Sequence, residues 1–362
     1  MPVREFVKSD VPAVVTLYWN YMTERTGPVP PQLLTSFTEL YFSNPFSGNP
    51  GPSFVYQDPS GEVLGFFGVT TRTMMFSGQP IRVGFAGNFV VHPRARSGVA
   101  APGLLAAYIS GDQDLLVTDT ANDISRHLMQ RLRFQTIPAL NLHWARPLRP
   151  SHYARYALAR AMSPATSFAF RLATKPLCAV IDRLVGDLQR SRHAKTVLHA
   201  SDLTVETLSH CLSEFRDGYS LRAEYDVKVL EWLLRFMDRN KKRGNLRKIA
   251  LRDDTNKVVG WYIYYSKPGA VGEVVQIGGA PDLFQSILGY LLTDAREHGA
   301  IALHGRADPR KIADLSDQNC LFTCRGGWTL AFSHRPELID ILRRGEALLS
   351  RLDGEWCLDP GE

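Results

Sequence analysis

The feature that most constrains the fold is the order of strand and helix patterns, which occurs twice along the chain. Residues 3–148 alternate short apolar strand patterns with helical patterns, and residues 196–335 follow the same order in outline. In the first stretch one apolar helix separates the strand ending at Val91 from the strand beginning at Leu115, which predicts a right-handed crossover. We therefore expect an α/β fold of the α+β type, with a mixed sheet in each of two similar units.

The patterns also predict the individual elements. In the first stretch these are strands at 3–7, 53–57, 63–76, 83–91, 115–118 and 139–145, and helices at 11–18, 31–42, 100–110 and 123–132. In the second stretch Asp202 and Asp226 are expected to cap helices, and a further helix is expected at 282–298. Strands are expected there at 246–252, 258–265, 270–277, 300–305 and 328–333.

The positive charge is concentrated in one segment. The chain has 362 residues and a net charge of +6, but residues 146–195 carry ten Lys or Arg and two Asp, so this segment is +8 and the rest is −2. Its apolar residues recur at helical spacing, interrupted by Pro164 and Pro176. We therefore divide the chain into a first unit at 1–148, a basic helical connector at 149–195, a second unit at 196–345 and a C-terminal tail at 346–362.

The connector has three interpretations. It is a solvated linker whose long side chains cover apolar surface, a surface that makes peripheral contact with an anionic glycolipid or membrane face, or a nucleic-acid contact. No recognised nucleic-acid-binding module accompanies the charge, so no specific nucleic acid is expected.

Composition excludes several classes of protein. No apolar run approaches the ~18–20 residues that cross a bilayer, and the opening MPVREFVKSD lacks the apolar stretch of a signal peptide. We therefore expect a soluble cytoplasmic protein whose five cysteines are reduced. Only Cys320 and Cys324 are close in sequence, and one such pair supplies too few zinc ligands, so no metal site is expected.

The loop after Val91 has the composition of an anion-binding turn. The segment FVVHPRARSGVAAPGLL turns at His92, carries Arg94 and Arg96, and enters a helix through Gly98 and small residues. Such a loop leaves backbone N–H groups unpaired at a helix N-terminus, where they and the helix dipole bind a pyrophosphate. Arginine adds charge-assisted hydrogen bonds to phosphate oxygens. Similar helix starts also occur without a ligand, so the motif alone leaves a purely structural interpretation open.

This loop resembles the acyl-CoA-binding motif of the GCN5-related N-acetyltransferase family, V-x-P-x-x-R/Q-x-x-G-x-G/A. Downstream, Asn122, Leu128 and Phe134 keep the spacing of the family's next strand and helix, and the opening VREFVKSDVPAVVTLYW looks like its first strand and helix. The resemblance covers about residues 3–148. It implies that the two units are acetyltransferase-like and that the first binds acetyl-CoA or a related acyl-CoA.

The chain departs from the family motif at three places. One residue, instead of two, separates Arg96 from Gly98, so either the loop is shorter or Val99 takes the glycine position. Met129 stands where the family commonly has a general-acid tyrosine, and Arg133 stands where it usually has glycine. Methionine cannot protonate a leaving thiolate, so the resemblance does not identify the acid.

The resemblance implies direct attack of an amine, or less often a hydroxyl, on the thioester. A backbone N–H near the end of the preceding strand polarises the carbonyl, and a base serves the nucleophile. The candidates for catalysis are Asn88, Glu24 and Asp119, with His92 and Asp123 also titratable and nearby in sequence. Each has a structural alternative: a sheet edge for Asn88, a helix-end charge for Glu24, a helix cap for the two aspartates, and a turn for His92.

The resemblance assigns the acyl-CoA contacts to the strand end, the loop and the cap of the following helix. These residues are Val90, Val91, His92, Arg94, Arg96, Ser97, Gly98, Val99, Ala100 and Asn122.

The corresponding junction of the second unit has the wrong charge for a diphosphate. Gly278 and Gly279 precede a helix whose first turn carries Asp282 and no basic residue. This unit resembles the degenerate copy found in tandem acetyltransferases. Its Trp261 and neighbouring tyrosines either line a groove or pack in the core.

Two functions of different classes follow. The first is acyl transfer from acetyl-CoA, or a related acyl-CoA, to an amine or hydroxyl of a small molecule or glycan precursor. The alternative is a non-enzymatic CoA-binding sensor or scaffold, motivated by Met129 and the degenerate second unit. A third possibility is that neither unit binds CoA.

Overall fold

A computed structural model describes residues 2–46, 52–159, 196–215, 218–324 and 327–361. Most of the basic connector lies outside the described residues, so the interpretations of it stay predictions. The chain forms two compact units that are not contiguous in sequence: unit 1 is Met1–Asn141, Arg216–Lys242 and Arg325–Glu362, and unit 2 is Leu142–Phe215 and Arg243–Cys324. These two units differ from the divisions predicted from the sequence, because each includes segments from both halves of the chain.

Unit 1 is built on a mixed sheet with the order β1-β2-β3-β4-β5-β15-β6, and β9 pairs with both β3 and β16. The strands are β1 Val3–Glu5, β2 Phe54–Gln57, β3 Val63–Phe76, β4 Gln79–Val91, β5 Leu115–Ala121, β6 Gln135–Thr136, β9 Leu221–Ala223, β15 Trp328–Phe332 and β16 Ala347–Leu348. The α-helices are α1 Val11–Tyr21, α2 Pro31–Phe42, α3 Ala100–Ile109, α4 Asp123–Arg131, α8 Val227–Asp238 and α11 Pro336–Arg343. Short 3₁₀ helices are η1 Lys8–Asp10, η2 Pro93–Ala95, η3 Pro138–Leu140 and η7 Trp356–Leu358.

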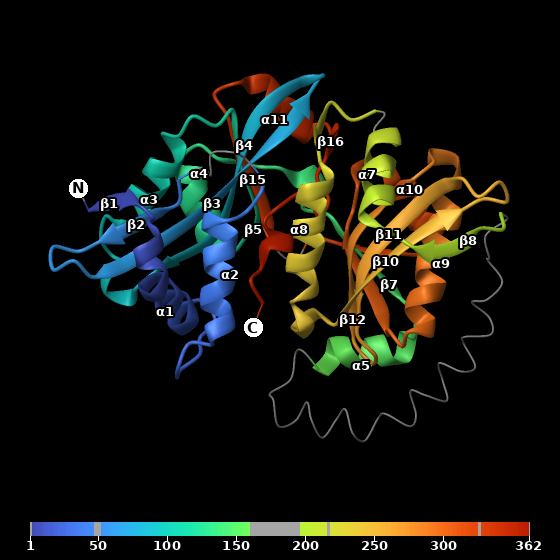
Figure 1. Ribbon diagram of the computed structural model, residues 1–362, viewed down its shortest axis with the longest axis horizontal. Helices are drawn as coiled ribbons and strands as arrows, with labels where there is room; N and C mark the ends of the chain where they lie inside the picture. The colour runs from blue at the N-terminus through green and yellow to red at the C-terminus, as the bar shows by residue number, and fades with distance from the viewer. Residues whose placement is uncertain (1, 47–51, 160–195, 216–217, 325–326, 362) are drawn as a thin grey trace. The chain divides into compact units, whose positions relative to one another are not determined.

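Helices cover both faces of this sheet because β3 buries both of its sides. Phe66 contacts the rings of Phe37 and Tyr41 on α2, whereas the next residue, Phe67, contacts Tyr108 on α3. Successive strand residues point to opposite faces, so α2 and α3 lie on opposite sides of β3. Figure 1 shows α1 beside α2, which it also contacts.

Unit 2 has a second mixed sheet with the order β14-β7-β13-β12-β11-β10-β8. Its strands are β7 His143–Pro147, β8 His199–Asp202, β10 Asn245–Arg252, β11 Val258–Ser266, β12 Val271–Gly279, β13 Ala302–Arg306 and β14 Leu321–Thr323. Its helices are α5 Pro150–Ala159, α7 Val205–Glu214, α9 Phe284–Glu297 and α10 Ile312–Asp317, with 3₁₀ turns η5 Pro281–Leu283 and η6 Pro309–Lys311. Its core contains the buried Ile287, Leu288 and Leu291 of α9.

The two sheets follow one plan, which confirms the prediction of a mixed α/β fold in two similar units. In unit 1, β3 and β4 are antiparallel, β4 and β5 parallel, and β5 and β15 antiparallel. In unit 2, β11 and β12 are antiparallel, β12 and β13 parallel, and β13 and β7 antiparallel.

In each unit, the strand that pairs antiparallel with the second parallel strand comes from the other half of the sequence. The strand predicted at 139–145 is displaced to β7, because Pro138 begins a 3₁₀ turn, and it pairs with β13 of unit 2 instead of completing the first sheet. Its place beside β5 is taken by β15. The expectation that the first 148 residues complete one sheet is therefore wrong.

Of the two caps predicted in the second half of the chain, one is wrong and one is confirmed. Asp202 ends β8, and the side chain of Thr204 caps α7 by accepting from the N–H of Thr207 at 3.2 Å. Asp226 caps α8 as predicted, accepting from the N–H of Val229 at 2.7 Å. Among the described helices none combines the length and the apolar character needed to cross a membrane.

Candidate active site

The two parallel strands of unit 1 separate at one end. β4 and β5 pair at Val83–Leu115, Gly84–Leu116 and Phe85–Val117. β4 then continues to Val91 and β5 to Ala121, but the two strands do not pair with each other beyond Phe85–Val117 in the described sheet. The N–H and C=O groups on the β5 side of β4 therefore lack a neighbouring strand beyond Phe85. We name the space between the diverging strands the β4–β5 opening.

The 92–99 loop and the start of α3 follow directly from this opening. Loop bonds run from the N–H groups of Ala95, Arg96 and Gly98 to the carbonyls three residues earlier. Val99 precedes α3 without a side-chain cap, and Val99 is well exposed. The first N–H groups of a helix have no intrahelical acceptor, so this end can bind an anion.

The predicted acyl-CoA contacts have defined places around the opening and the loop. Val90 and Val91 are buried at the end of β4, and Ala100 is buried in the first turn of α3. Arg94 forms an exposed ion pair with Glu62 at 2.7 Å, and the Nε of Arg96 donates to the carbonyl of Val91 at 3.1 Å.

His92 serves the turn. Its Nδ1 accepts from the N–H of Arg94 at 3.1 Å, so its proton lies on Nε2, which is 2.8 Å from the hydroxyl of Tyr21. This matches the structural alternative given for His92 from sequence. Both ring nitrogens are used within unit 1.

A β-bulge brings a polar side chain into the site. The register of β3 and β4 shifts between Phe67–Phe89 and Gly68–Gly87, which leaves Asn88 as the extra residue, with a left-handed φ of 28°. Its Nδ2 donates to the hydroxyl of Tyr41 on α2 at 2.9 Å. A side chain at Gly68 would overlap that hydroxyl, so glycine at this position lets the phenol reach the bulge.

The tail of the chain supplies a carboxylate to the same place. Oε1 of Glu355 accepts from Thr118 Oγ1 at 2.9 Å, from the N–H groups of Asp119 at 3.1 Å and Thr120 at 2.7 Å, and from the hydroxyl of Thr120. Oε2 faces β4, 3.6 Å from where a Cβ on Gly87 would stand, and the hydroxyl of Tyr41 is 3.9 Å from that point. The carboxylate therefore sits between the diverging strands.

The proton affinity of this carboxylate is unusual. Burial, followed by the negative charge of Asp119, raises the pKa of Glu355 to about 8, even though its hydrogen-bond donors oppose the shift. Because four donors converge on Oε1, the titrating proton belongs on Oε2, the oxygen that faces Gly87. Burial also raises the pKa of Tyr41 well above its ordinary value, which keeps the phenol protonated.

A buried arginine holds the segment that carries Glu355. Arg72 on β3 donates to the carbonyls of Leu352 at 3.0 Å and Gly354 at 3.2 Å, and it lies over the ring of Phe46 at 4.2 Å. The next element, η7, packs against α8. Any side chain on residue 354 would overlap the carboxylate of Asp119, so glycine at this position allows the backbone to approach β5.

The structure brings two of the three predicted catalytic residues together. Asn88 and Asp119 flank the β4–β5 opening, and Oδ1 of Asp119 accepts from the N–H of Glu355 at 3.1 Å. Glu24 is exposed on the loop after α1, with a left-handed φ of 56°. The cap suggested for Asp119 and Asp123 is instead Asn122, whose side chain accepts from the N–H of Ser125 at 2.8 Å.

The two departures in and just after α4 have clear structural roles. Met129 is 2% exposed and packs in the core of unit 1. Arg133 adopts a left-handed φ of 69°, the conformation that explains a preference for glycine at this turn.

Sequence reasoning missed Glu355 and Tyr41. Glu355 lies 236 residues from Asp119, in a segment assigned to the tail, and no local pattern marks it. Tyr41 belongs to the apolar stripe of α2 and reads as core. The available signal was the pair Gly354-Glu355 in a polar tail, which is too common to single out.

Unit 2 packs an aromatic ring against the end of its corresponding strand, β12. β12 and β13 pair only from Val271–Ala302 to Glu273–His304, while β12 continues to Gly279. The indole of Trp261 packs where a side chain of Gly278 would stand, and its Nε1 donates to Gln276 at 3.1 Å. The groove suggested for this tryptophan is filled by the ring itself, which is 3% exposed.

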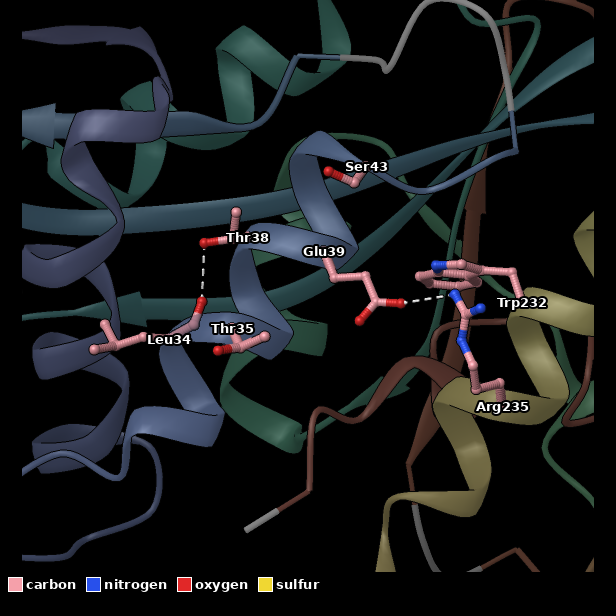
Figure 2. A pocket seen from close by; sticks show the side chains of 7 residues that line it. All are labelled: Leu34, Thr35, Thr38, Glu39, Ser43, Trp232 and Arg235. Carbon is pink, nitrogen blue, oxygen red and sulfur yellow. Dashed lines mark hydrogen bonds and ion pairs between the residues drawn. The ribbon is translucent and has the colours of Figure 1, made fainter.

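Unit 1 also contains a pocket between α2 and α8. Figure 2 shows Glu39 of α2 and Arg235 of α8 reaching toward one another, with the indole of Trp232 beside them. The cavity has a volume of about 540 Å³ and is lined by Leu34, Thr35, Thr38, Glu39, Ser43, Trp232 and Arg235.

Comparisons with known proteins bear on the fold. No family model and no curated protein sequence matches the chain. A conserved Enterococcus faecalis V583 protein described as a probable N-acyltransferase aligns with a TM-score of 0.61 and 11% identity, over 91% of this chain and 71% of that one. A GCN5-related N-acetyltransferase from Anabaena variabilis gives 0.58 and 11%, over 92% and 73%.

The resemblance extends to a larger acyltransferase. Saccharomyces cerevisiae N-myristoyltransferase, solved with bound myristoyl-CoA, aligns with a TM-score of 0.54 and 9% identity, over 91% of this chain and 78% of that one. These alignments show that the chain has the fold of the GCN5-related N-acetyltransferases, and its two units of one plan are consistent with the alignment to N-myristoyltransferase.

Proposed function

We propose that the protein transfers an acyl group from acetyl-CoA, or a related acyl-CoA, to an amine, and that unit 1 is the reacting unit. The observation that carries this proposal is the Glu355 carboxylate in the β4–β5 opening, with its pKa raised to about 8 and its Oε2 facing Gly87. Perturbed carboxylates in such positions are candidates for acid–base catalysis. An acyl-CoA sensor would have no use for this group.

The residues around the opening fit an acyl-CoA. The uncapped start of α3 and the exposed Arg96 side chain suit the pyrophosphate, while Ser97, Gly98 and Val99 leave the loop backbone accessible. Val90 and Val91 lie at the end of β4, which has no neighbouring strand on its β5 side in the described sheet. This side of the strand offers backbone groups to the pantetheine amides. Arg94 is paired with Glu62, so it would contribute only after exchanging that partner.

Glu355 is the proposed general base. Oε2 takes the proton from the attacking nitrogen as that nitrogen bonds to the thioester carbon. A group with a pKa near 8 is matched to an amine better than an ordinary carboxylate, because proton transfer is then less uphill. Unpaired N–H groups of β4 near the bulge are the proposed donors to the carbonyl oxygen.

Tyr41 is the proposed acid in place of Met129. Asn88 donates to its hydroxyl, so the phenolic proton is free for another acceptor. As the carbon–sulfur bond breaks, Tyr41 gives this proton to the thiolate and later regains one from solvent. Glu355 and Tyr41 both reach the point beside Gly87, so one reacting centre lies within range of both.

The proposal is tested with acetyl-, octanoyl- and myristoyl-CoA against a panel of primary amines. We expect Glu355→Gln to retain acyl-CoA binding, measured by calorimetry, and to lose about 10²–10⁴-fold in the rate of transfer. Glu273→Gln, a matched carboxylate on β12 of unit 2, is expected to leave the rate unchanged. Tight binding without transfer to any amine by the parent protein would favour the sensor.

A further inference from the structure

Asp119 and Glu355 hold each other's backbone across 236 residues of sequence. Oδ1 of Asp119 accepts from the N–H of Glu355 at 3.1 Å, and Oε1 of Glu355 accepts from the N–H of Asp119 at 3.1 Å. The two residues thus exchange hydrogen bonds from backbone to side chain in both directions. We name this arrangement the Asp119–Glu355 clasp. Hydrogen bonds to charged acceptors are strong, so the clasp fixes both carboxylates beside the β4–β5 opening.

The surroundings leave the clasp little freedom. Asp119 is 3% exposed, and a side chain on residue 354 would overlap its Oδ2. Thr118 Oγ1 and the N–H of Thr120 also donate to Oε1 of Glu355, at 2.9 and 2.7 Å. Two carboxylates are therefore held close together in a buried place. Ionising both of them there is unfavourable.

The nearest titratable groups on the helices and on the Glu355 segment add no further negative charge at neutral pH. Burial raises the pKa of Tyr41 on α2 and of Tyr108 on α3 well above that of an ordinary phenol. Burial also raises the pKa of the Cys357 thiol, which follows Glu355 on η7. The helix that packs against η7 is α8, and its charged side chains are exposed: Lys228, Glu231, Arg235 and Asp238.

Two further buried charged residues lie on or beside the Glu355 segment. Arg72 on β3 donates to the carbonyls of Leu352 and Gly354, and its Nη2 lies 3.5 Å from Cys357 Sγ. Asp353 accepts from the hydroxyl of Tyr225 at 2.7 Å, and from the N–H and the hydroxyl of Ser350, both at 2.6 Å. Both side chains thus bond to groups other than Glu355, whereas Asp119 bonds to Glu355 directly.

We infer that Asp119 is a positioning residue for the proposed base: the clasp places Glu355 in the β4–β5 opening and keeps a second carboxylate next to it. The inference rests on the proposed function for the role of Glu355 as a base. Asp119 acts through Glu355 and not on the substrate, a role distinct from the catalytic one expected from the sequence.

The second carboxylate has a chemical consequence. A fixed negative charge disfavours ionisation of a neighbouring carboxyl, and after burial the charge of Asp119 is the largest influence that raises the pKa of Glu355. The hydrogen bond of Asp119 therefore orients Glu355, and its charge sets the pH range over which Glu355 accepts a proton.

Substitution separates the hydrogen bond from the charge. Asp119→Asn keeps an oxygen that can accept from the N–H of Glu355 and removes the charge. We expect the apparent pKa of the single-turnover transfer rate to fall from about 8 by about 1 unit or more. The plateau rate is expected to fall only about 3-fold, because the base becomes weaker. Asp119→Glu retains the charge and is expected to retain an apparent pKa near 8.

Asp114→Asn is the matched control. Asp114 precedes the opposite end of β5, where its Oδ2 accepts from the N–H of Arg82 at 2.8 Å. This variant also loses a carboxylate charge beside a backbone N–H, and we expect it to keep the parent's apparent pKa and plateau rate. If Asp119 were only a structural residue, Asp119→Asn would lower the plateau rate without moving the apparent pKa, and that result overturns the inference.

A titration without substrate separates this inference from the proposed function. The side-chain carboxyl ¹³C resonance of Glu355, assigned by its loss in Glu355→Gln, is followed from pH 3 to 10 in the parent protein and in Asp119→Asn. A lower midpoint in the variant supports the inference even if no acyl transfer is found. Equal midpoints refute it, and the proposed function then stands if the parent transfers acyl groups.

A second variant and the parent itself keep the test decisive. If Asp119→Asn does not fold, as judged by circular dichroism, Asp119→Ser removes the same charge with a smaller side chain and is expected to lower the midpoint in the same direction. A midpoint near the ordinary 4.5 for Glu355 in the parent protein refutes the inference without any variant.

Discussion

The two units share one strand plan but treat the space between their parallel strands differently. In unit 1 the β4–β5 opening holds the carboxylate of Glu355 beside an unsubstituted Gly87. In unit 2 the ring of Trp261 packs against Gly278, near the end of β12. The same topology thus provides a polar, titratable opening in one unit and packed aromatic core in the other.

The strand bulges show the same contrast. The β3–β4 register shift leaves Asn88 as the extra residue, whereas the β11–β12 shift between Ile263–Gln276 and Tyr264–Val274 leaves Val275, which is 2% exposed. A polar residue at the bulge of unit 1 orients Tyr41, while an apolar residue in unit 2 packs. Under the proposed function, side-chain chemistry, and not backbone topology, distinguishes the reacting unit from the other unit.

The largest expected effect is on the stability of unit 2. Trp261→Ala removes a buried ring and its hydrogen bond to Gln276, which is expected to lower the free energy of unfolding by about 3–5 kcal/mol. Urea denaturation measures this loss. The number of acyl-CoA molecules bound per chain, measured by calorimetry, is expected to equal that of the parent. A second acyl-CoA site in the variant would show instead that the Trp261 ring prevents acyl-CoA from binding to unit 2.

A matched pair of glycine substitutions sharpens the comparison. A Cβ at Gly278 overlaps the indole of Trp261, so Gly278→Ala is expected to destabilise the protein by about 1–3 kcal/mol through overpacking. Gly87 has no such neighbour, since the nearest atom is Glu355 Oε2 at 3.6 Å. Gly87→Ala is therefore expected to unfold like the parent but to transfer acyl groups about 10-fold more slowly, because its methyl group stands in the opening. Equal stability of the two variants contradicts the account.

The last expected effect is on the pH dependence of stability. The pKa of Glu355 is about 8 in the folded protein against an ordinary 4.5, so between these values the folded state binds more protons than the unfolded state. The stabilising contribution of this group to the free energy of unfolding is therefore fully present below pH 4.5, and it is lost as the pH rises through 8. Glu355→Gln keeps an acceptor oxygen and removes the titration. Urea denaturation at pH 5, 7 and 9 is expected to show a shallower decline for the variant, and identical declines count against a raised pKa.

Local patterns predicted most elements because each depends on residues close in sequence. The stripe of α1, the β2–β3 hairpin and the Asp226 cap of α8 all follow from neighbours a few residues apart. The exchange of β7 and β15 did not, because an alternating apolar strand fits either sheet and the choice depends on non-local pairing.

The site was predictable in part for the same reason. The 92–99 loop and Asn88 lie on one continuous stretch, so a motif identifies them. Glu355 reaches Asp119 only after Arg72 fixes the backbone at Leu352 and Gly354, contacts that span about 280 residues. Such a contact leaves no spacing pattern in the sequence from which it could be predicted.

The central claim is that Glu355 in the β4–β5 opening is the base for acyl transfer. It is tested most directly by the pH dependence of the single-turnover transfer rate with saturating acyl-CoA, in the parent protein and in Glu355→Gln. The account predicts a parent rate that rises with pH and levels off with an apparent pKa near 8, and a slow variant whose profile lacks that step. A variant with the parent's rate and profile would contradict the account.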